Sequence, residues 1–188
     1  MAGGVRIVSG RLKGRRLATP AGLGTRPTAD RVREAVFSIL YGRIAGARVL
    51  DLFSGSGALA LEAISRGAQS ALAIDRDPAA ISVIRRNITH CGVDDRAAVI
   101  GWDIRASLDC LSRRPETYSL IFLDPPYASD LAGIAMAHLH AAGCVSPGAT
   151  LVVEHSQQQI PEAIEGFCML TDRRRYGKTL VSFFTTML

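Results

Sequence analysis

From residue 48 onward, short apolar runs alternate with longer stretches in which apolar residues recur at helical spacing. The apolar runs predict strands over residues 49–53, 71–75, 97–101, 120–123 and 149–154, each short and mostly apolar, as buried strands are. The longer stretches, rich in Ala, Leu, Ile and Arg, predict helices over residues 59–66, 78–90, 104–113 and 130–142. This alternation predicts an α/β fold, a parallel sheet with helices on both faces.

The pattern changes at both ends of the chain. Residues 167–175 and 179–186 predict two strands joined by a turn that contains Gly177, an antiparallel hairpin that would make the sheet mixed at one edge. Near the start, residues 10–14 predict a short hairpin, and residues 30–41 predict a helix with one apolar face.

Composition fits one globular domain with a core: 188 residues are 48% hydrophobic and 21% charged. The net charge of +5 is unevenly distributed, because the first 48 residues carry ten Lys and Arg against two acidic residues, and the remainder is acidic. A polyanionic partner is therefore expected at the N-terminal part of the chain.

The sequence argues against a membrane-spanning or secreted protein and against one held by disulfides or metal ions. The chain lacks the run of roughly 20 apolar residues that a membrane-spanning helix needs, and its start does not resemble a signal peptide, so a cytoplasmic location is expected. The four cysteines are far apart, and the His residues have no partner at ligand spacing. Neither a disulfide framework nor a metal site is therefore expected.

The first buried strand leads into a glycine turn with the sequence Asp51-Leu-Phe-Ser-Gly-Ser-Gly57. Its glycine spacing also fits a dinucleotide fingerprint, with Asp75 as the ribose ligand, so a nicotinamide-dependent oxidoreductase is one alternative. The carboxylate of Asp51 would repel a pyrophosphate at this turn, but it would suit the ammonium group of a methionine moiety. The turn therefore favours S-adenosylmethionine.

Acidic residues follow the next two strands at the same sheet edge. Asp75 is expected to accept hydrogen bonds from ribose hydroxyls, with Arg76 beside it as a further cofactor contact. Asp103 can accept from an adenine amino group while the backbone near Ile104 supplies the remaining contacts, although a helix N-cap explains Asp103 equally well.

The sequence Asp124-Pro125-Pro126-Tyr127 comes directly after an apolar strand. The prolines fix the backbone and leave carbonyl acceptors exposed, while Asp124 adds a carboxylate acceptor and Tyr127 a flat ring. An exocyclic amine could donate to Asp124 and a proline carbonyl while its base stacks on Tyr127. These four residues are the candidate catalytic group.

Together, the glycine turn and the Asp-Pro-Pro-Tyr sequence resemble those of Rossmann-like amino-methyltransferases that use S-adenosylmethionine. Two N-terminal segments, 6–14 and 26–37, extend the likeness to the RsmD-type enzymes that methylate guanine N2 in 16S ribosomal RNA. The resemblance implies a seven-stranded sheet and one domain over 1–188, with a basic extension at 1–30 and a catalytic core at 31–188. It also implies that Ser54, Gly55 and Gly57 line the cofactor. Trp102 replaces the small residue more usual before Asp103.

The basic N-terminal residues are the expected contacts to RNA phosphates, in ribosomal RNA or an assembling 30S subunit. They are Arg6, Arg11, Lys13, Arg15, Arg16, Arg26, Arg31 and Arg33. The sequence also admits an adenine-N6 methyltransferase that acts on DNA or RNA, and an RNA-binding module without catalysis. A monomer is slightly favoured.

Overall fold

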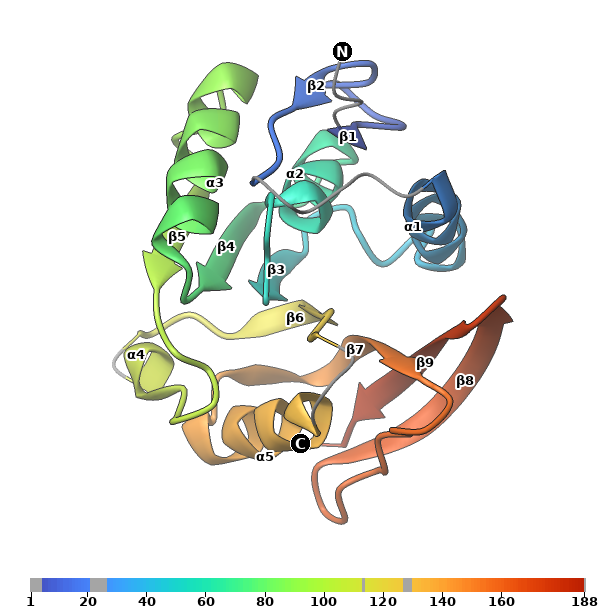
Figure 1. The fold of residues 1–188 in the computed structure, drawn as a ribbon. Helices are drawn as coiled ribbons and strands as arrows, with labels where there is room; N and C mark the ends of the chain where they lie inside the picture. The colour runs from blue at the N-terminus through green and yellow to red at the C-terminus, as the bar shows by residue number, and fades with distance from the viewer. Residues whose placement is uncertain (1–4, 21–26, 113, 127–129, 188) are drawn as a thin grey trace. The chain divides into compact units, whose positions relative to one another are not determined.

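The structure is a computed structural model that describes residues 5–20, 27–112, 114–126 and 130–187. Within the first helix, side chains are described only from Asp30 onward. The chain divides into two compact units, Met1–Gly101 and Trp102–Leu188. Figure 1 shows the helices and strands of each unit.

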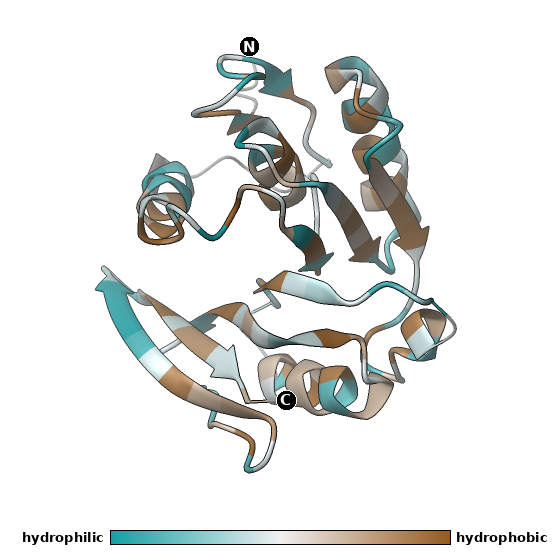
Figure 2. Ribbon diagram, turned by 180° about the vertical axis from the view of Figure 1, so that it is seen from behind, coloured by the Kyte–Doolittle hydropathy of each residue, from teal (hydrophilic) through white to brown (hydrophobic). Residues whose placement is uncertain are grey.

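The first unit contains three parallel strands in the order β5-β4-β3. Helices α2 and α3 pack on them. The bounds are β3 Arg48–Leu52, α2 Ala58–Ser65, β4 Ser70–Asp75, α3 Pro78–Cys91 and β5 Ala97–Gly101. Pro78 occupies the first turn of α3, where the missing N–H costs nothing, and the Asp77 side chain accepts from the Ala79 N–H at 2.9 Å. The two strands β3 and β4 are almost wholly buried, and Figure 2 shows β4 as hydrophobic.

The N-terminal part of this unit is a short antiparallel hairpin followed by a helix. The hairpin pairs β1 Val5–Arg6 with β2 Arg16–Leu17, and the predicted 10–14 segment lies in the connection between them. Helix α1 spans Pro27–Ile39 and begins three residues earlier than the sequence pattern predicted. Its apolar face buries Val32, Val36 and Phe37.

The second unit carries four strands in the order β6-β7-β9-β8. Strands β6 and β7 are parallel, whereas β9 is antiparallel to both of its neighbours, so the predicted mixed sheet and C-terminal hairpin are confirmed. The bounds are α4 Asp109–Ser112, β6 Tyr118–Leu123, α5 Leu131–Ala142, β7 Val145–Ser156, β8 Cys168–Tyr176 and β9 Thr179–Thr186. With the three strands of the first unit, these complete the seven expected strands.

The helix predicted over residues 104–113 is wrong, because α4 has only four residues. Asp103 explains the difference: its carboxylate accepts from the Arg105 N–H at 3.1 Å, and its carbonyl accepts from the Ala106 N–H at 3.1 Å, which closes a turn. The Trp102 indole donates to the Ser107 carbonyl at 2.9 Å and holds this turn closed. The next helix, α4, begins at Asp109.

No helix among the described residues has both the length and the apolar character needed to cross a membrane.

Candidate active site

The glycine turn between β3 and α2 has left-handed glycines and is hydrogen-bonded to β4. The backbone is left-handed at Gly55 and Gly57, with φ of +56° and +74°. A Cβ at Gly57 would lie 3.2 Å from Ile84 Cγ2, so glycine satisfies both the conformation and the packing. The Ser54 N–H donates to the Ile74 carbonyl, and the Ser54 hydroxyl accepts from the Ile74 N–H, both at 3.1 Å, which fastens the turn to β4.

Asp51 is the most unusual group in this turn. Its side chain is 1% exposed, and Oδ2 accepts from the Ala60 N–H at 3.1 Å. Oδ1 is buried and has no hydrogen-bond partner within the described part of the chain. Burial raises the Asp51 pKa to about 7, against the lowering effect of the Ala60 hydrogen bond. A buried carboxylate oxygen without a partner is a suitable site for a cationic group of a ligand.

Asp75 lies at the carboxyl end of β4 and faces the same turn. Its Oδ2 accepts from the Gly55 N–H at 2.8 Å and its Oδ1 from the Asp77 N–H at 3.0 Å. Each carboxylate oxygen has further lone pairs, so the carboxylate can still accept from hydroxyls while it organises the turn. Arg76 follows it and is exposed. Asp51, Ser54, Gly55, Gly57 and Asp75 thus come together in the first unit.

Asp103 and Ile104 belong to the second unit. Besides the Arg105 N–H, the Asp103 carboxylate accepts from the Arg105 guanidinium, including Nε–Oδ1 at 2.9 Å, and this ion pair is largely exposed. Ile104 is buried, and its carbonyl lies 2.9 Å from His138 Nδ1. The N-cap interpretation of Asp103 is wrong for α4, which begins six residues later. The adenine contact stays a prediction.

The Asp-Pro-Pro segment directly follows β6. Asp124 is exposed, Pro125 is buried and Pro126 is exposed. Buried Pro125 anchors the segment, while its neighbours on both sides reach solvent. Tyr127 lies outside the described residues, so its predicted stacking role is not addressed by the structure.

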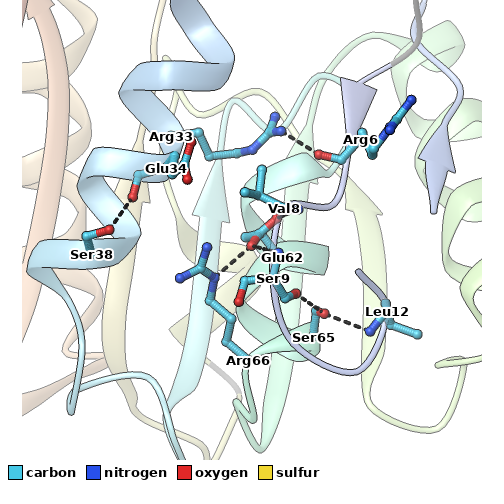
Figure 3. A network of polar contacts seen from close by, with 10 residues as sticks. All are labelled: Arg6, Val8, Ser9, Leu12, Arg33, Glu34, Ser38, Glu62, Ser65 and Arg66. Carbon is cyan, nitrogen blue, oxygen red and sulfur yellow. Dashed lines mark hydrogen bonds and ion pairs between the residues drawn. The ribbon is translucent and has the colours of Figure 1, made fainter. Parts of the chain in front are cut away.

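The basic N-terminal hairpin is fixed to α2 by two buried polar side chains (Figure 3). Glu62, 1% exposed, accepts from the Val8 N–H at 2.8 Å, the Ser9 N–H at 3.0 Å and Arg66 Nε at 2.7 Å. The Ser65 hydroxyl accepts from the Leu12 N–H at 2.9 Å and donates to the Ser9 carbonyl. The described hairpin is therefore held against α2 within the first unit. Sequence reasoning missed Glu62 and Ser65.

Asn87 joins the same hairpin to the glycine turn. Its side chain is 2% exposed and exchanges two hydrogen bonds with the Ala18 backbone, both at 2.9 Å. The Asn87 Nδ2 group also donates to the Ser56 carbonyl in the glycine turn at 2.9 Å. A polar residue at the helical spacing of buried Val83 and Ile84 was the available signal for this role.

The candidate RNA-binding residues fall into two groups. Arg6, Arg11, Lys13, Arg15, Arg16 and Arg31 are exposed, and Arg26 lies outside the described residues. Arg33 differs, because it is 8% exposed, donates to the Arg6 carbonyl at 2.7 Å and pairs with Asp30 at 3.2 Å. Arg33 therefore fastens α1 to the hairpin, and this buried position does not suit a phosphate contact.

Gly10 tests the importance of this docking. A Cβ there would lie 1.9 Å from the Ser65 carbonyl oxygen, and φ is +81°, so we expect Gly10→Ala to lower the free energy of unfolding by about 2 kcal/mol or more. Gly14→Ala is the matched control, because φ is +87° but no atom lies within 4 Å, and only about 1 kcal/mol of backbone strain is expected. Urea unfolding measures both. Equal losses would contradict the docking interpretation.

Within the described part of the chain, no group of three or more His, Cys, Asp or Glu side chains is arranged to hold a metal ion.

Comparison with known proteins assigns the family. Residues 5–185 match the model of the family described as conserved hypothetical protein 95. The ribosomal RNA small subunit methyltransferase D of Escherichia coli K12 is 35% identical over 153 residues, 81% of this chain and 75% of that protein. Its counterpart from Haemophilus influenzae is 32% identical over 176 residues, 91% and 89% of the two chains.

Solved structures agree with this assignment. The structure of the Escherichia coli protein yhhF has a TM-score of 0.84 and 30% identity, and covers 98% of this chain and 99% of that one. A hypothetical protein of Thermus thermophilus has a TM-score of 0.77 and 32% identity, and covers 95% and 98%. The expected Rossmann-like methyltransferase fold is confirmed, and the chain belongs to the conserved hypothetical protein 95 family of methyltransferases.

Proposed function

We propose that this chain transfers a methyl group from S-adenosylmethionine to the exocyclic N2 amine of a guanine in 16S ribosomal RNA. Family membership supports methyl transfer and ribosomal RNA as the substrate class. The structural observation that carries the cofactor assignment is the buried Asp51 oxygen without a partner, beside a left-handed glycine turn.

The cofactor fits the chemistry of the first unit. The ammonium of the methionine moiety would pair with Asp51, and the ribose hydroxyls would donate to Asp75. Ser54, Gly55 and Gly57 would hold the turn that the cofactor contacts, and Arg76, Asp103 and Ile104 are the proposed surroundings of the ribose and adenine. Asp51 also explains why a nicotinamide dinucleotide is the poorer ligand, because a pyrophosphate would meet a second negative charge there.

The proposed acceptor site is Asp124 with the two proline carbonyls and Tyr127. The guanine amine is a weak nucleophile because its lone pair is delocalised into the ring, so positioning it in line with the methyl-sulfur bond is the main catalytic contribution. S-adenosylmethionine would supply the methyl group: the nitrogen would form a bond to the methyl carbon as the carbon-sulfur bond breaks, and the sulfur would keep the electron pair. The proton then leaves the cationic nitrogen for Asp124 or water.

The RNA would be held by its phosphates on the exposed basic residues of the N-terminal hairpin. We expect Arg11→Gln with Lys13→Gln to weaken RNA binding and to reduce the slope of log K against log salt by about 0.7 to 0.9 for each phosphate that is no longer neutralised. Filter binding across a salt series measures both quantities. Arg85→Gln with Arg86→Gln, exposed on α3, is the charge-matched control. An unchanged slope in the hairpin variant would contradict this assignment.

We further propose that residues 1–188 work as one methyltransferase domain with the 1–30 segment as its basic extension, that the protein acts in the cytoplasm as a monomer, and that the acceptor is ribosomal RNA, either free or within an assembling 30S subunit.

The decisive experiment uses labelled S-adenosylmethionine with unmethylated small-subunit RNA, free and in 30S particles, followed by nucleoside digestion and mass spectrometry. We expect labelled N2-methylguanosine. A labelled methyladenosine would move the activity to adenine N6, and cofactor binding without transfer to either acceptor would contradict the proposal.

A further inference from the structure

The end of the β8–β9 hairpin carries a second concentration of positive charge. Its residues 173–178 hold four basic side chains, Arg173, Arg174, Arg175 and Lys178. The second unit has seven basic and nine acidic residues in total, so more than half of its cations lie in this one turn. Figure 2 shows this end of β8 as hydrophilic. Because β8 is the last strand in the sheet order, the cluster borders an open sheet edge.

The three arginines are fixed by the same kind of contact. Each donates its inner nitrogen, Nε, to an acceptor of the hairpin. Arg173 donates to Ser182 Oγ at 2.8 Å and Arg174 to Asp172 Oδ2 at 2.8 Å. Arg175 donates to the Gly177 carbonyl at 3.0 Å. Ser182 is fixed in turn, since its hydroxyl lies 2.8 Å from Nε2 of buried His155.

These Nε contacts have an energetic consequence for binding. An arginine binds a phosphate through a planar fork of N–H donors, and ordering a flexible side chain at an interface costs roughly 0.5 to 1.5 kcal/mol. A guanidinium that is already oriented by its Nε has lost part of that freedom before binding. Arg174 and Arg175 are exposed, so they present oriented cations to solvent. An ordinary solvated charge run would have no such repeated anchoring.

From this arrangement we infer that residues 173–178 form a second RNA-binding surface, which contacts the phosphate backbone. The inference rests on the proposed function, because it takes RNA as the partner. It adds a contact region that the basic N-terminus does not provide. The competing explanation is that the arginines only prevent the edge of β8 from pairing with another strand.

The test compares two triple variants that lose the same charge. Arg174→Gln, Arg175→Gln and Lys178→Gln remove the hairpin cations but keep Arg173, whose anchor leads to buried His155. The control, Arg85→Gln, Arg86→Gln and Arg114→Gln, removes three exposed arginines elsewhere. Binding of unmethylated 16S RNA is measured over a salt series. We expect about 10- to 100-fold weaker binding and a slope lower by about 2 for the hairpin variant only.

The outcomes separate this inference from the proposed function. Absence of methyl transfer by the unchanged protein would overturn the proposed function. Normal transfer with equal RNA affinity and salt slope in both triple variants would overturn only the second surface. Aggregation of the hairpin variant with unchanged RNA affinity would establish the edge-protection explanation instead.

A measurement on the unchanged protein covers the case in which the hairpin variant fails to fold. Arginine modification by phenylglyoxal is followed by mass spectrometry, with and without RNA. We expect RNA to slow modification of Arg174 and Arg175 at least several-fold, while Arg85 and Arg86 are modified at the same rate. Equal modification of all four in the two conditions would contradict the inference.

Discussion

Replacing Asp124 with alanine is expected to lower methyl transfer by about 10²- to 10³-fold while the affinity for S-adenosylmethionine stays within a few-fold. The amine nitrogen gains positive charge as the carbon-nitrogen bond forms, so a hydrogen bond from the amine to a carboxylate strengthens in the transition state. Asp124 is exposed at the end of β6 and follows a buried strand that holds its backbone in place. Its loss should therefore affect chemistry more than folding.

Single-turnover transfer and calorimetry of cofactor binding measure the two quantities separately. Asp124→Asn keeps one carbonyl acceptor but loses the charge, so we expect an intermediate rate. Glu116→Ala, at another exposed acidic residue of the second unit, is the control and should leave both quantities unchanged. A methyl-transfer rate of Asp124→Ala within about threefold of that of the unchanged protein would contradict the acceptor-site assignment.

Asp51→Asn is expected to have opposite effects on cofactor binding and on stability. The variant loses the negative charge proposed to pair with the methionine ammonium, so we expect at least tenfold weaker cofactor binding. The free protein should gain stability, because the pKa of Asp51 is about 7 in the folded protein and 3.8 in the reference state. Folding therefore opposes ionisation of this carboxyl.

The destabilisation of the free protein by Asp51 increases with pH. The destabilisation from Asp51 is absent below pH 3.8, grows as the pH rises towards 7 and is complete above it. The stability gain of Asp51→Asn should follow this window and reach between about 1 and 4 kcal/mol at pH 8, after the cost of an unpaired amide hydrogen. Thermal unfolding at pH 4 and pH 8 measures the difference. An equal or larger gain at pH 4 would contradict this interpretation.

Cofactor affinity should show the complementary trend. Below pH 7 the free protein must release a proton from Asp51 to bind the ammonium, so the affinity should fall up to tenfold for each pH unit. Asp51→Asn should lose this dependence. Retention of it would place the titrating group elsewhere.

Elements that begin directly after a turn are well predicted from the sequence, whereas side-chain contacts that stop a helix are not. The strands at 97–101 and 179–186 match their predicted bounds, and each begins directly after a polar or glycine-containing turn that marks its start. Residues 104–113 have helical composition, but the side chain of Asp103 and the indole of Trp102 close a turn there. Composition carries no information about such competing contacts.

The candidate site was only partly readable for a similar reason. Asp51 and the glycines could be identified because their spacing is local. Glu62 and Asn87, by contrast, accept hydrogen bonds from residues 54 and 69 positions away. The partner of such a buried polar side chain is known only from the folded structure. The cations of residues 173–178 are not evident from charge totals, because the net charge of residues 49–188 is negative.

The docking of the N-terminal hairpin also orders the assembly of the first unit in time. The hairpin is synthesised first, yet Glu62 and Asn87, which hold it, are added to the chain 54 and 69 residues later. Closing loops of this length costs chain entropy, and the contacts to Glu62 and Asn87 offset that cost. The hairpin can therefore dock only when α2 and α3, which carry these residues, have formed. The basic hairpin therefore leaves the ribosome undocked and joins the unit only after α2 and α3 have emerged.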